Sequence, residues 1–457
     1  MVIKIPEALI SSLKGVKGFD EKSFIQIHES GQQVVSIRIN PAKFDIQHCT
    51  FDIDEAVPWS SSGYYLKERP SFTTDPLFHA GAYYVQEASS MFLEEAIRQT
   101  CDLSQPIRVL DLCAAPGGKS TLIQSVISDE SLLVSNELIK SRVNILAENM
   151  TKWGAANVVV TNNDPSHFKR LPAFFDLIVV DAPCSGSGLF RKDPAAVNEW
   201  SINNVELCCQ RQQKILADIM QSLKPRGILI YSTCSYSLKE DEDIEDWLVE
   251  NYSINNTRLT IKEEWGIVET VSDKHKCYGY RCYPDKLKGE GFFITVFKKG
   301  DELTDTKEFK SRPKPALINK QAEALLTNYL LHPEKYRFVL WQDEVLAFPA
   351  ILYDAILVLQ SALYLKKAGV KMGGLIRNEL IPHHEWAISS IASHQLPSIE
   401  VDKETALQYL RRNEINLESN TSGWARITYR KFPLGLVKVL PGRTNNYYPK
   451  EWRILNK

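Results

Sequence analysis

The stretch Val109-Leu110-Asp111-Leu112-Cys113-Ala114-Ala115-Pro116-Gly117-Gly118-Lys119-Ser120 decides the fold of this chain. It begins with a short, mostly apolar run that is typical of a buried strand. Small residues and two glycines follow, which let backbone N–H groups approach a ligand, and a helix N-terminus there favours negative charge. The spacing matches neither a G-x-x-x-x-G-K phosphate loop nor a G-x-G-x-x-G dinucleotide loop. Taken alone, the turn is also consistent with a purely structural role.

Further β-rich runs and helical stretches surround this turn. The runs lie at residues 107–112, 132–136, 157–161, 176–180, 227–232 and 292–297. Strands that alternate with helices predict a parallel sheet covered by helices on both faces. The sequence therefore predicts an α/β fold built on a doubly wound, Rossmann-like sheet.

Three successive strands of the predicted sheet end in acidic residues, namely Glu137, Asp164 and Asp181. Ligands of an open α/β sheet lie at the carboxyl ends of the strands, where an acid can hold ribose hydroxyls or an adenine amino group. Any one of these acids could instead be solvated or cap a helix. The ordered trio beside the glycine turn indicates a nucleoside cofactor.

Two cysteines, Cys184 and Cys234, follow the fourth and fifth strands of this sheet. These strands are neighbours in a doubly wound sheet, so both thiols should open onto the crevice beside the glycine turn. A thiolate is a strong nucleophile that can form a covalent adduct. Neither cysteine belongs to a C-x-x-C pair, so we expect no metal site, and burial as a small apolar side chain is the remaining alternative.

With both thiols placed, the chain resembles the RNA cytosine-5 methyltransferases of the Nop/Sun family, and within it the bacterial RsmF-like ribosomal RNA branch. The matching blocks are residues 110–119, 181–186 and 232–235, with shorter matches at 36–41, 83–90 and 190–194. Residues 423–424 and 433–438 are similar to the PUA-like RNA-binding tail of that family. The fold implied is a class I methyltransferase domain with a small N-terminal α+β module and a C-terminal PUA-like region.

The resemblance implies S-adenosyl-L-methionine as the cofactor and Cys234 as the nucleophile on carbon 6 of cytosine. Cys184 would help to release the product, and Asp181 would stabilise charge on the ring. The cofactor-binding residues implied are Cys113, Ala114, Ala115, Pro116, Gly117, Gly118, Lys119, Glu137, Asp164 and Asp181. The target base should be unpaired or flipped out, because a stacked base is not open to attack.

The 457 residues are enough for about three domains. A charged stretch that ends in prolines predicts a linker, and beyond it we expect a helix at 318–331 and a strand at 338–348. The expected division is an N-terminal RNA-binding module (1–100), a methyltransferase domain (101–300), a linker (301–315), an intermediate domain (316–372) and a PUA-like RNA-binding domain (373–457).

Charge is unevenly distributed along the chain. The net charge is −2 overall, whereas the last 34 residues, Trp424 to Lys457, carry eight basic residues against one acid, a net charge of +7. This local excess indicates a polyanionic partner, for which we expect ribosomal RNA or a ribosomal subunit. The longest apolar stretch is interrupted by Pro349 and Asp354, so no membrane segment is expected. Nine cysteines and a start without a signal-peptide pattern favour the cytoplasm, and we expect a monomer.

Two alternatives remain open. The chain could methylate a transfer RNA by the same chemistry, or it could be a catalytically silent RNA-binding factor for ribosome assembly. DNA enzymes of this chemistry use the cysteine of the Pro-Cys block and lack the Thr-Cys-Ser block, so the presence of both thiols favours RNA. Retention of Cys184, Cys234 and the acidic strand ends argues against a silent factor.

Overall fold

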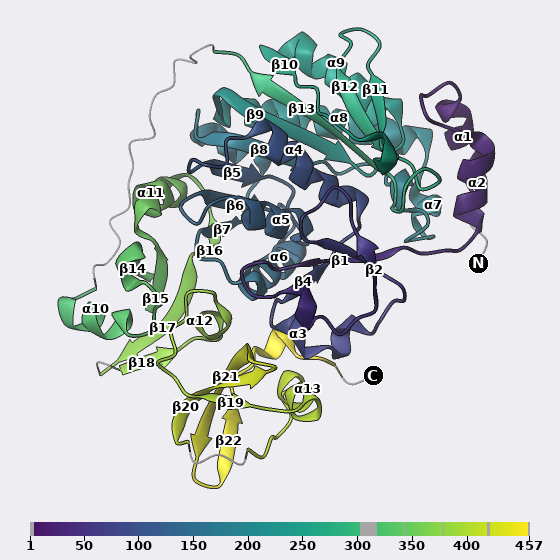
Figure 1. Cartoon of the computed structure of the whole chain (residues 1–457). Coiled ribbons are helices and arrows are strands. Elements are labelled where there is room, and N and C mark those ends of the chain that lie inside the picture. Colours follow the sequence, from purple (N-terminus) through teal and green to yellow (C-terminus); the bar gives the residue numbers. More distant parts are fainter. Residues whose placement is uncertain (1–3, 302–317, 342, 378, 418–420, 456–457) are drawn as a thin grey trace.

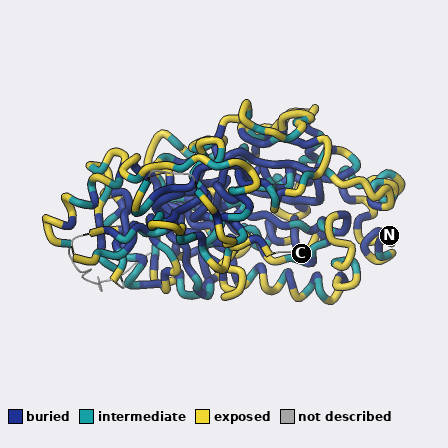
Figure 2. Tube along the Cα trace, turned by 90° about the horizontal axis from the view of Figure 1, so that it is seen from below, coloured by how far each residue is buried: buried dark blue, intermediate teal, exposed yellow. Residues whose placement is uncertain are grey.

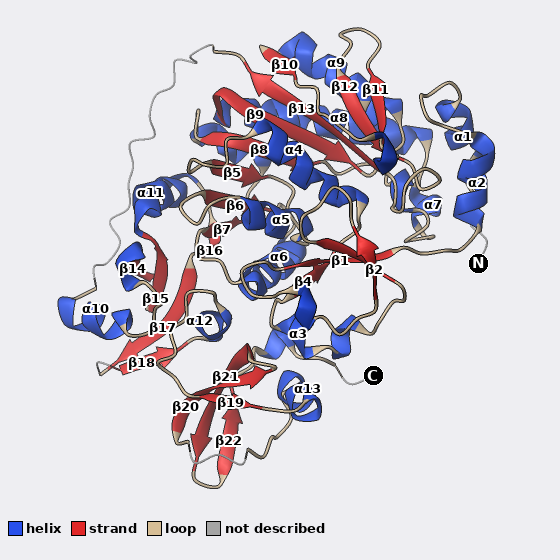
Figure 3. Cartoon of the chain, in the orientation of Figure 1, coloured by secondary structure: helices blue, strands red, loops and turns tan. Residues whose placement is uncertain are grey.

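The computed structural model describes residues 4–301, 318–341, 343–377, 379–417 and 421–455. Over these residues the chain forms four β-sheets, the largest of which lies at the centre of the molecule (Figures 1 and 3). The predicted linker at 301–315 lies outside the described residues apart from Asp301.

The central sheet contains the six predicted strands, which are β5 (Arg108–Asp111), β6 (Leu132–Asn136), β7 (Val158–Thr161), β8 (Phe175–Asp181), β9 (Leu223–Thr233) and β13 (Phe292–Lys299). It also contains four strands that were not predicted, namely β10 (Ile254–Asn256), β11 (Val268–Val271), β12 (Tyr278–Cys282) and β16 (Leu365–Ala368). Their order is β11-β12-β13-β9-β8-β5-β6-β7-β16, with β10 paired to β13. Strands β5 to β9 pair in parallel, and β13 is antiparallel to β9. The α/β fold predicted from the sequence is confirmed.

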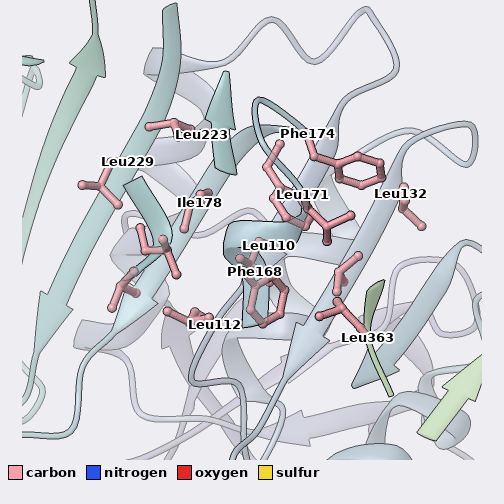
Figure 4. Packing of buried hydrophobic residues seen from close by; sticks show 14 of the residues in the cluster. Leu110, Leu112, Leu132, Phe168, Leu171, Phe174, Ile178, Leu223, Leu229 and Leu363 are labelled. Carbon is pink, nitrogen blue, oxygen red and sulfur yellow. The ribbon is translucent and has the colours of Figure 1, made fainter. Parts of the chain in front are cut away.

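Helices cover both faces of this sheet. One face packs against α4 (Leu93–Thr100), α5 (Gly118–Val126) and α6 (Lys140–Trp153), and the other against α8 (Ile202–Ile219), α9 (Glu242–Asn251) and α11 (Tyr353–Ala362). Each face has its own hydrophobic core, and successive strand residues alternate between the two. Val109 belongs to the first core, on the side of α4, α5 and α6, Leu110 belongs to the second core, on the side of α8, α9 and α11, and both are fully buried. Figure 4 shows part of the second core, and Figure 2 shows the buried chain running through the centre.

The N-terminal region forms a four-stranded antiparallel sheet in the order β2-β3-β1-β4. Its strands are β1 (Val35–Ile39), β2 (Ile53–Ala56), β3 (Gly63–Leu66) and β4 (Tyr83–Val85), and its helices are α1 (Glu7–Leu13), α2 (Glu21–Glu29) and α3 (Pro76–His79). The first two helices pack instead against the methyltransferase region, where Phe24 contacts Tyr236, close to α7 (Ala196–Glu199).

The third sheet follows the predicted linker, and it differs from the sequence prediction in the region of residues 338–348. Its elements are α10 (Lys320–Thr327), β14 (Tyr336–Trp341), β15 (Glu344–Pro349), β17 (Val370–Ile376), β18 (Glu379–Pro382) and α12 (His384–Ile388). The single strand expected at 338–348 is wrong, because β14 and β15 form an antiparallel hairpin. The sequence between the two apolar runs is polar at residues 342–344, and Asp343 there adopts a left-handed φ of 64°, so this polar break was the available signal of the reversal. The boundary expected between residues 372 and 373 falls inside β17.

The C-terminal sheet contains β19 (Ser398–Glu400), β20 (Gly423–Tyr429), β21 (Phe432–Leu440) and β22 (Arg443–Asn446), with α13 (Lys403–Arg411) packed against it. This sheet lies beside the N-terminal region, as Figure 1 shows near α3. The rings of Phe44 and Phe432 are 5.4 Å apart there. Within the described part of the chain, no helix is both long enough and apolar enough to cross a membrane.

Candidate active site

The two predicted catalytic cysteines, Cys184 and Cys234, lie together at the carboxyl ends of β8 and β9. Their Sγ atoms are 3.1 Å apart, and both side chains are partly exposed. The strands pair in parallel up to Asp181 and Ser232, so the turn after each strand carries one thiol to the same edge. The hydrogen bond to Cys234 raises the pKa of Cys184 well above its usual value, and burial adds to this shift. The juxtaposition expected from the sheet topology is confirmed.

The glycine turn lies beside the thiols and leads into α5. Gly117 has a φ of +118°, a left-handed conformation that suits glycine, and Gly118 is the first residue of the helix. The turn is fixed from α6, since Arg142 donates to the backbone oxygen of Ala115 at 2.7 Å and Asn149 donates to that of Pro116 at 2.8 Å. Backbone N–H groups at this helix start are therefore held ready for a ligand.

Asp111, the last residue of β5, is a site residue that the sequence interpretation missed. It is fully buried, and its Oδ2 accepts a hydrogen bond from Ser120 Oγ at 2.6 Å. Its Oδ1 is buried without a hydrogen-bond partner among the described residues. Burial raises the pKa of this carboxyl to about 7. Its place at the end of a strand, directly before the glycine turn, was the available signal.

The acids after β6 and β7 have different surroundings. Glu137 is buried, and its Oε1 accepts from the backbone N of Ile139 at 2.9 Å. Asp164 is less buried and caps the 3₁₀ turn Pro165–Arg170, where it accepts from Ser166 N at 2.9 Å. These hydrogen bonds to Ser166 hold the pKa of Asp164 below its usual value. Both acids lie at the carboxyl edge of the sheet, and their cofactor roles stay predictions.

Asp181 connects the glycine turn to the thiols. Its Oδ2 lies 2.8 Å from Lys119 Nζ, and its Oδ1 accepts from Ser232 Oγ at 2.9 Å. The opposite charge of Asp181 keeps the pKa of Lys119 above its usual value despite the lysine's burial. Lys119 also lies over the ring of Phe292, with Nζ 5.2 Å from its centroid. The predicted cofactor lysine and the predicted catalytic acid therefore form one ion pair.

The N-terminal sheet supports the glycine turn from behind. Arg38 of β1 is fully buried and donates to the backbone oxygen of Gly118 at 3.3 Å and to Thr121 Oγ1 at 2.5 Å. A Cβ atom at Gly118 would lie 3.3 Å from the ring of Tyr84 on β4. Burial lowers the pKa of Arg38 to about 9. The block at residues 36–41 carries part of the family resemblance, but nothing in the sequence predicts the contact of Arg38 with α5.

Comparison with known proteins supports the same interpretation along the whole chain. Residues 99–298 match the family model for 16S rRNA methyltransferase RsmB/F, and residues 5–88 match the N-terminal domain of 16S rRNA methyltransferase RsmF. Residues 396–454 match the methyltransferase RsmF PUA domain. A ribosomal RNA small subunit methyltransferase F from Aliivibrio fischeri (strain MJ11) is 30% identical over 91% of this chain and 90% of its own length. This chain belongs to the RsmF family.

Other relatives agree with the RsmF assignment. A ribosomal RNA small subunit methyltransferase F from Psychromonas ingrahamii is 29% identical and covers 98% of this chain and 97% of its own. A methyltransferase homolog from Pyrococcus horikoshii covers 65% of this chain and 100% of its own, with 26% identity and a TM-score of 0.52. NSun6 from the same organism shares the fold, with a TM-score of 0.53 at 18% identity over 65% of this chain and 99% of its own.

The RsmF assignment confirms several expectations from the sequence. The chain is an S-adenosylmethionine-dependent methyltransferase of the ribosomal RNA cytosine-5 class, with an RsmF N-terminal domain and a C-terminal PUA domain. Asp111 Oδ1, which has no hydrogen-bond partner among the described residues, suits the cationic amino group of a cofactor, and the N-terminus of α5 after Gly117 suits a carboxylate. The donors and acceptors at this RsmF-family site therefore fit S-adenosylmethionine.

Proposed function

We propose that this chain methylates carbon 5 of a cytosine in small-subunit ribosomal RNA through a covalent adduct on Cys234. The observation that carries the proposal is the contact between the Cys184 and Cys234 thiols, 3.1 Å apart, beside the Lys119–Asp181 ion pair. The names of the relatives, which are small-subunit methyltransferases, support this choice of RNA.

The cofactor would lie along the carboxyl edge of β5, β6 and β7 and supply the methyl group. In our proposal the turn from Cys113 to Lys119 holds its amino acid end, because the N-terminus of α5 and the carboxylate of Asp111 adjoin this turn. Glu137 and Asp164 would hold the ribose hydroxyls or the adenine amino group, as acids at the carboxyl ends of parallel strands can.

The chemistry requires a nucleophile because carbon 5 of cytosine is a poor nucleophile on its own. Attack of the Cys234 thiolate forms a bond from Sγ to carbon 6 and gives carbon 5 enamine character. After carbon 5 has gained its methyl group, it loses its proton to a base, and the electrons of that bond expel the thiolate. We assign Cys184 to this release step, since it lies within reach of the same ring edge.

Asp181 would stabilise the ring during attack. Lys119 and Ser232 hold its two carboxylate oxygens, so its orientation is set before the base arrives. Placed at the N3 and N4 edge of cytosine, such a group compensates charge that develops as the thiolate adds. Both faces of the base are needed, so we propose that the target nucleotide is unpaired or flipped out.

We further propose that the N-terminal and PUA regions bind the RNA around the target and that the enzyme acts as a cytoplasmic monomer. The five-part division expected from the sequence stays a proposal. The net +7 of the last 34 residues supports an RNA contact at the C-terminal end.

Transfer of a tritiated methyl group to small-subunit RNA tests the function. We expect label in RNA with the natural chain and none with Cys234→Ala, while S-adenosylmethionine binding survives, because the nucleophile and the cofactor turn are separate. Bisulfite sequencing of RNA from cells that lack the chain should show the loss of one or more 5-methylcytosines in small-subunit RNA. Loss in transfer RNA instead would favour the alternative substrate, and no loss at all would favour a silent assembly factor.

A further inference from the structure

Glu240 lies between the two cysteine loops. It ends the 3₁₀ turn Leu238–Glu240, which follows β9, and it is fully buried. Its Oε1 accepts hydrogen bonds from Ser185 N at 2.8 Å and from Gln212 Nε2 at 3.1 Å. Its Oε2 accepts from Ser185 Oγ at 2.5 Å and from Ser235 Oγ at 2.7 Å. An ionised carboxylate is an acceptor only, so all four bonds suit it.

The donors come from three separate parts of the site. Ser185 directly follows Cys184 in the sequence, and Ser235 directly follows Cys234. Gln212 belongs to α8, which packs on the face of the central sheet that α9 and α11 also cover. One buried carboxylate therefore connects the residue after each thiol, and it connects both to a rigid helix.

The loops need such a connection because neither has regular structure at the thiol. After Cys184 the chain runs Ser185-Gly186-Ser187-Gly188, with Gly186 in the left-handed region at a φ of +75°. The two loops also share a backbone hydrogen bond, in which Gly188 N donates to the carbonyl oxygen of Cys234 at 2.7 Å. The bonds of Glu240 add the side-chain connection next to the reacting groups.

We propose that Glu240 is a positioning residue for methyl transfer, whose carboxylate sets the separation and orientation of the two thiols. The inference rests on the proposed two-thiol chemistry, in which Cys234 must reach carbon 6 while Cys184 serves the adjacent carbon 5. A displacement of about 1 Å in either loop is expected to cost on the order of 100-fold in rate.

The charge of Glu240 has a second consequence for the pair. After the hydrogen bond to Cys234 and burial, the negative charge of Glu240 contributes to the raised pKa of Cys184. This charge therefore favours the protonated form of Cys184. A protonated Cys184 agrees with the proposed roles, in which Cys234 is the nucleophile.

Two variants separate the geometry from the charge. Glu240→Ala removes all four bonds. In Glu240→Gln the amide oxygen can accept from Ser185 N and Gln212, and the amide NH₂ can donate to the hydroxyls of Ser185 and Ser235, which are free to rotate. We expect kcat to fall about 100-fold in the Ala variant, with an unchanged KM for S-adenosylmethionine, and less than about 10-fold in the Gln variant.

Glu94→Ala is the matched control. Glu94 is also a buried carboxylate, and it accepts hydrogen bonds from Ser60, Ser61 and Arg98 on the N-terminal side of the molecule. Its loss removes a comparable set of hydrogen bonds, and the three partners named belong to neither cysteine loop. We expect kcat of this variant to stay near that of the natural chain.

A measurement without RNA reports the thiol geometry directly. Diamide oxidises two adjacent thiols to a disulfide and takes up their two electrons and two protons, and mass spectrometry of peptides identifies the Cys184–Cys234 product. We expect this product to form about 10-fold more slowly in Glu240→Ala and at the natural rate in Glu240→Gln and Glu94→Ala. The proposal would be overturned if a folded Glu240→Ala variant formed the Cys184–Cys234 disulfide at the rate of the natural chain and also had the kcat of the natural chain.

Failure of the proposed function gives a different pattern. If the natural chain transfers no methyl group but the trapping rate depends on Glu240, the carboxylate still positions the pair and the assigned reaction is wrong. If Glu240→Ala does not fold by circular dichroism, Ser235→Ala, which deletes one donor, should lower kcat and trapping about 10-fold. Natural values in that variant would also overturn the proposal.

Discussion

The division of labour between the two thiols is decided at the residue scale. Removing Cys184 leaves attack by Cys234 possible but impairs release of the methylated base. We therefore expect Cys184→Ala to accumulate a covalent protein–RNA adduct that survives a denaturing gel, with turnover lowered by about 100-fold or more. An adduct that forms in Cys234→Ala instead would exchange the two roles.

Asp111 gives a second residue-scale prediction, which concerns pH. Burial raises its folded-state pKa from 3.8 to about 7, so between these values the folded chain holds a proton that the unfolded chain has lost. Its contribution to stability is complete below pH 3.8 and is lost as the pH rises to about 7. Asn is neutral throughout this range. The free energy of unfolding of the natural chain, measured in urea relative to Asp111→Asn, should fall by roughly 3 kcal/mol between about pH 4.5 and pH 8. A constant difference would contradict the raised pKa.

Individual site residues differed in how far the sequence could predict them. Cys184 and Cys234 were placed correctly because the order of parallel strands forces neighbouring strand ends together. Asp111 and Glu240 were missed because an acid within a strand or after a turn usually faces solvent, and only tertiary packing buries these two. Asp164, in contrast, was predicted to bind the cofactor, but one of its carboxylate oxygens accepts a local hydrogen bond from Ser166.

At the element scale, strands with both faces buried were predicted well, whereas the edge strand β16 was not. β6 matches the expected residues 132–136, because its apolar run has clear polar limits. β16 was not predicted as part of the central sheet. It pairs with β7, some 200 positions earlier in the chain, and local periodicity contains no information about so distant a partner.

Gly369 lies between β16 of the central sheet and β17 of the third sheet, and it gives an element-scale prediction. It follows β16, has a φ of +61°, and donates from its backbone N to the oxygen of Val158 at 3.0 Å. A Cβ atom would lie 2.4 Å from the backbone oxygen of Ala347. Gly442 has a similar φ of +75°, but a Cβ there meets nothing within 4 Å. Gly369→Ala should therefore lower the free energy of unfolding by about 1–3 kcal/mol more than Gly442→Ala. Equal losses in denaturant titrations would mean that the close contact with Ala347 relaxes.

At the scale of the whole molecule, the N-terminal region contacts both C-terminal sheets and the methyltransferase core. Lys43 marks the junction, because its Nζ donates to the backbone oxygens of Ala80, Lys152 and Ile388 at 3.1, 2.6 and 2.7 Å. Burial lowers the pKa of this lysine to about 7. The two regions proposed to bind RNA thus lie side by side, although they stand at opposite ends of the sequence (Figure 1).

This arrangement determines how the basic C-terminal end should be tested. Deleting residues 424–457 would remove β20, β21 and β22 and expose the surface of the N-terminal region that Phe432 covers. Charge reversal avoids this. Lys431 and Arg443 are exposed and Lys438 is partly exposed, so replacing all three with Glu leaves the core in place. We expect weaker binding of ribosomal RNA at moderate salt, because Lys and Arg contacts to phosphate release bound counterions.

The salt dependence decides whether these three side chains contact phosphate. Each lost contact should lower the slope of log affinity against log salt by about 0.7 to 0.9, while the affinity for S-adenosylmethionine, measured by calorimetry, stays the same. The matched control reverses three exposed lysines in the region of β10 to β13, at the other end of the molecule in Figure 1: Lys262, Lys276 and Lys298. If both triple variants stay folded by circular dichroism and lose RNA affinity equally, the effect is one of net charge. An unchanged affinity and slope in the C-terminal variant would show that its basic face does not bind RNA.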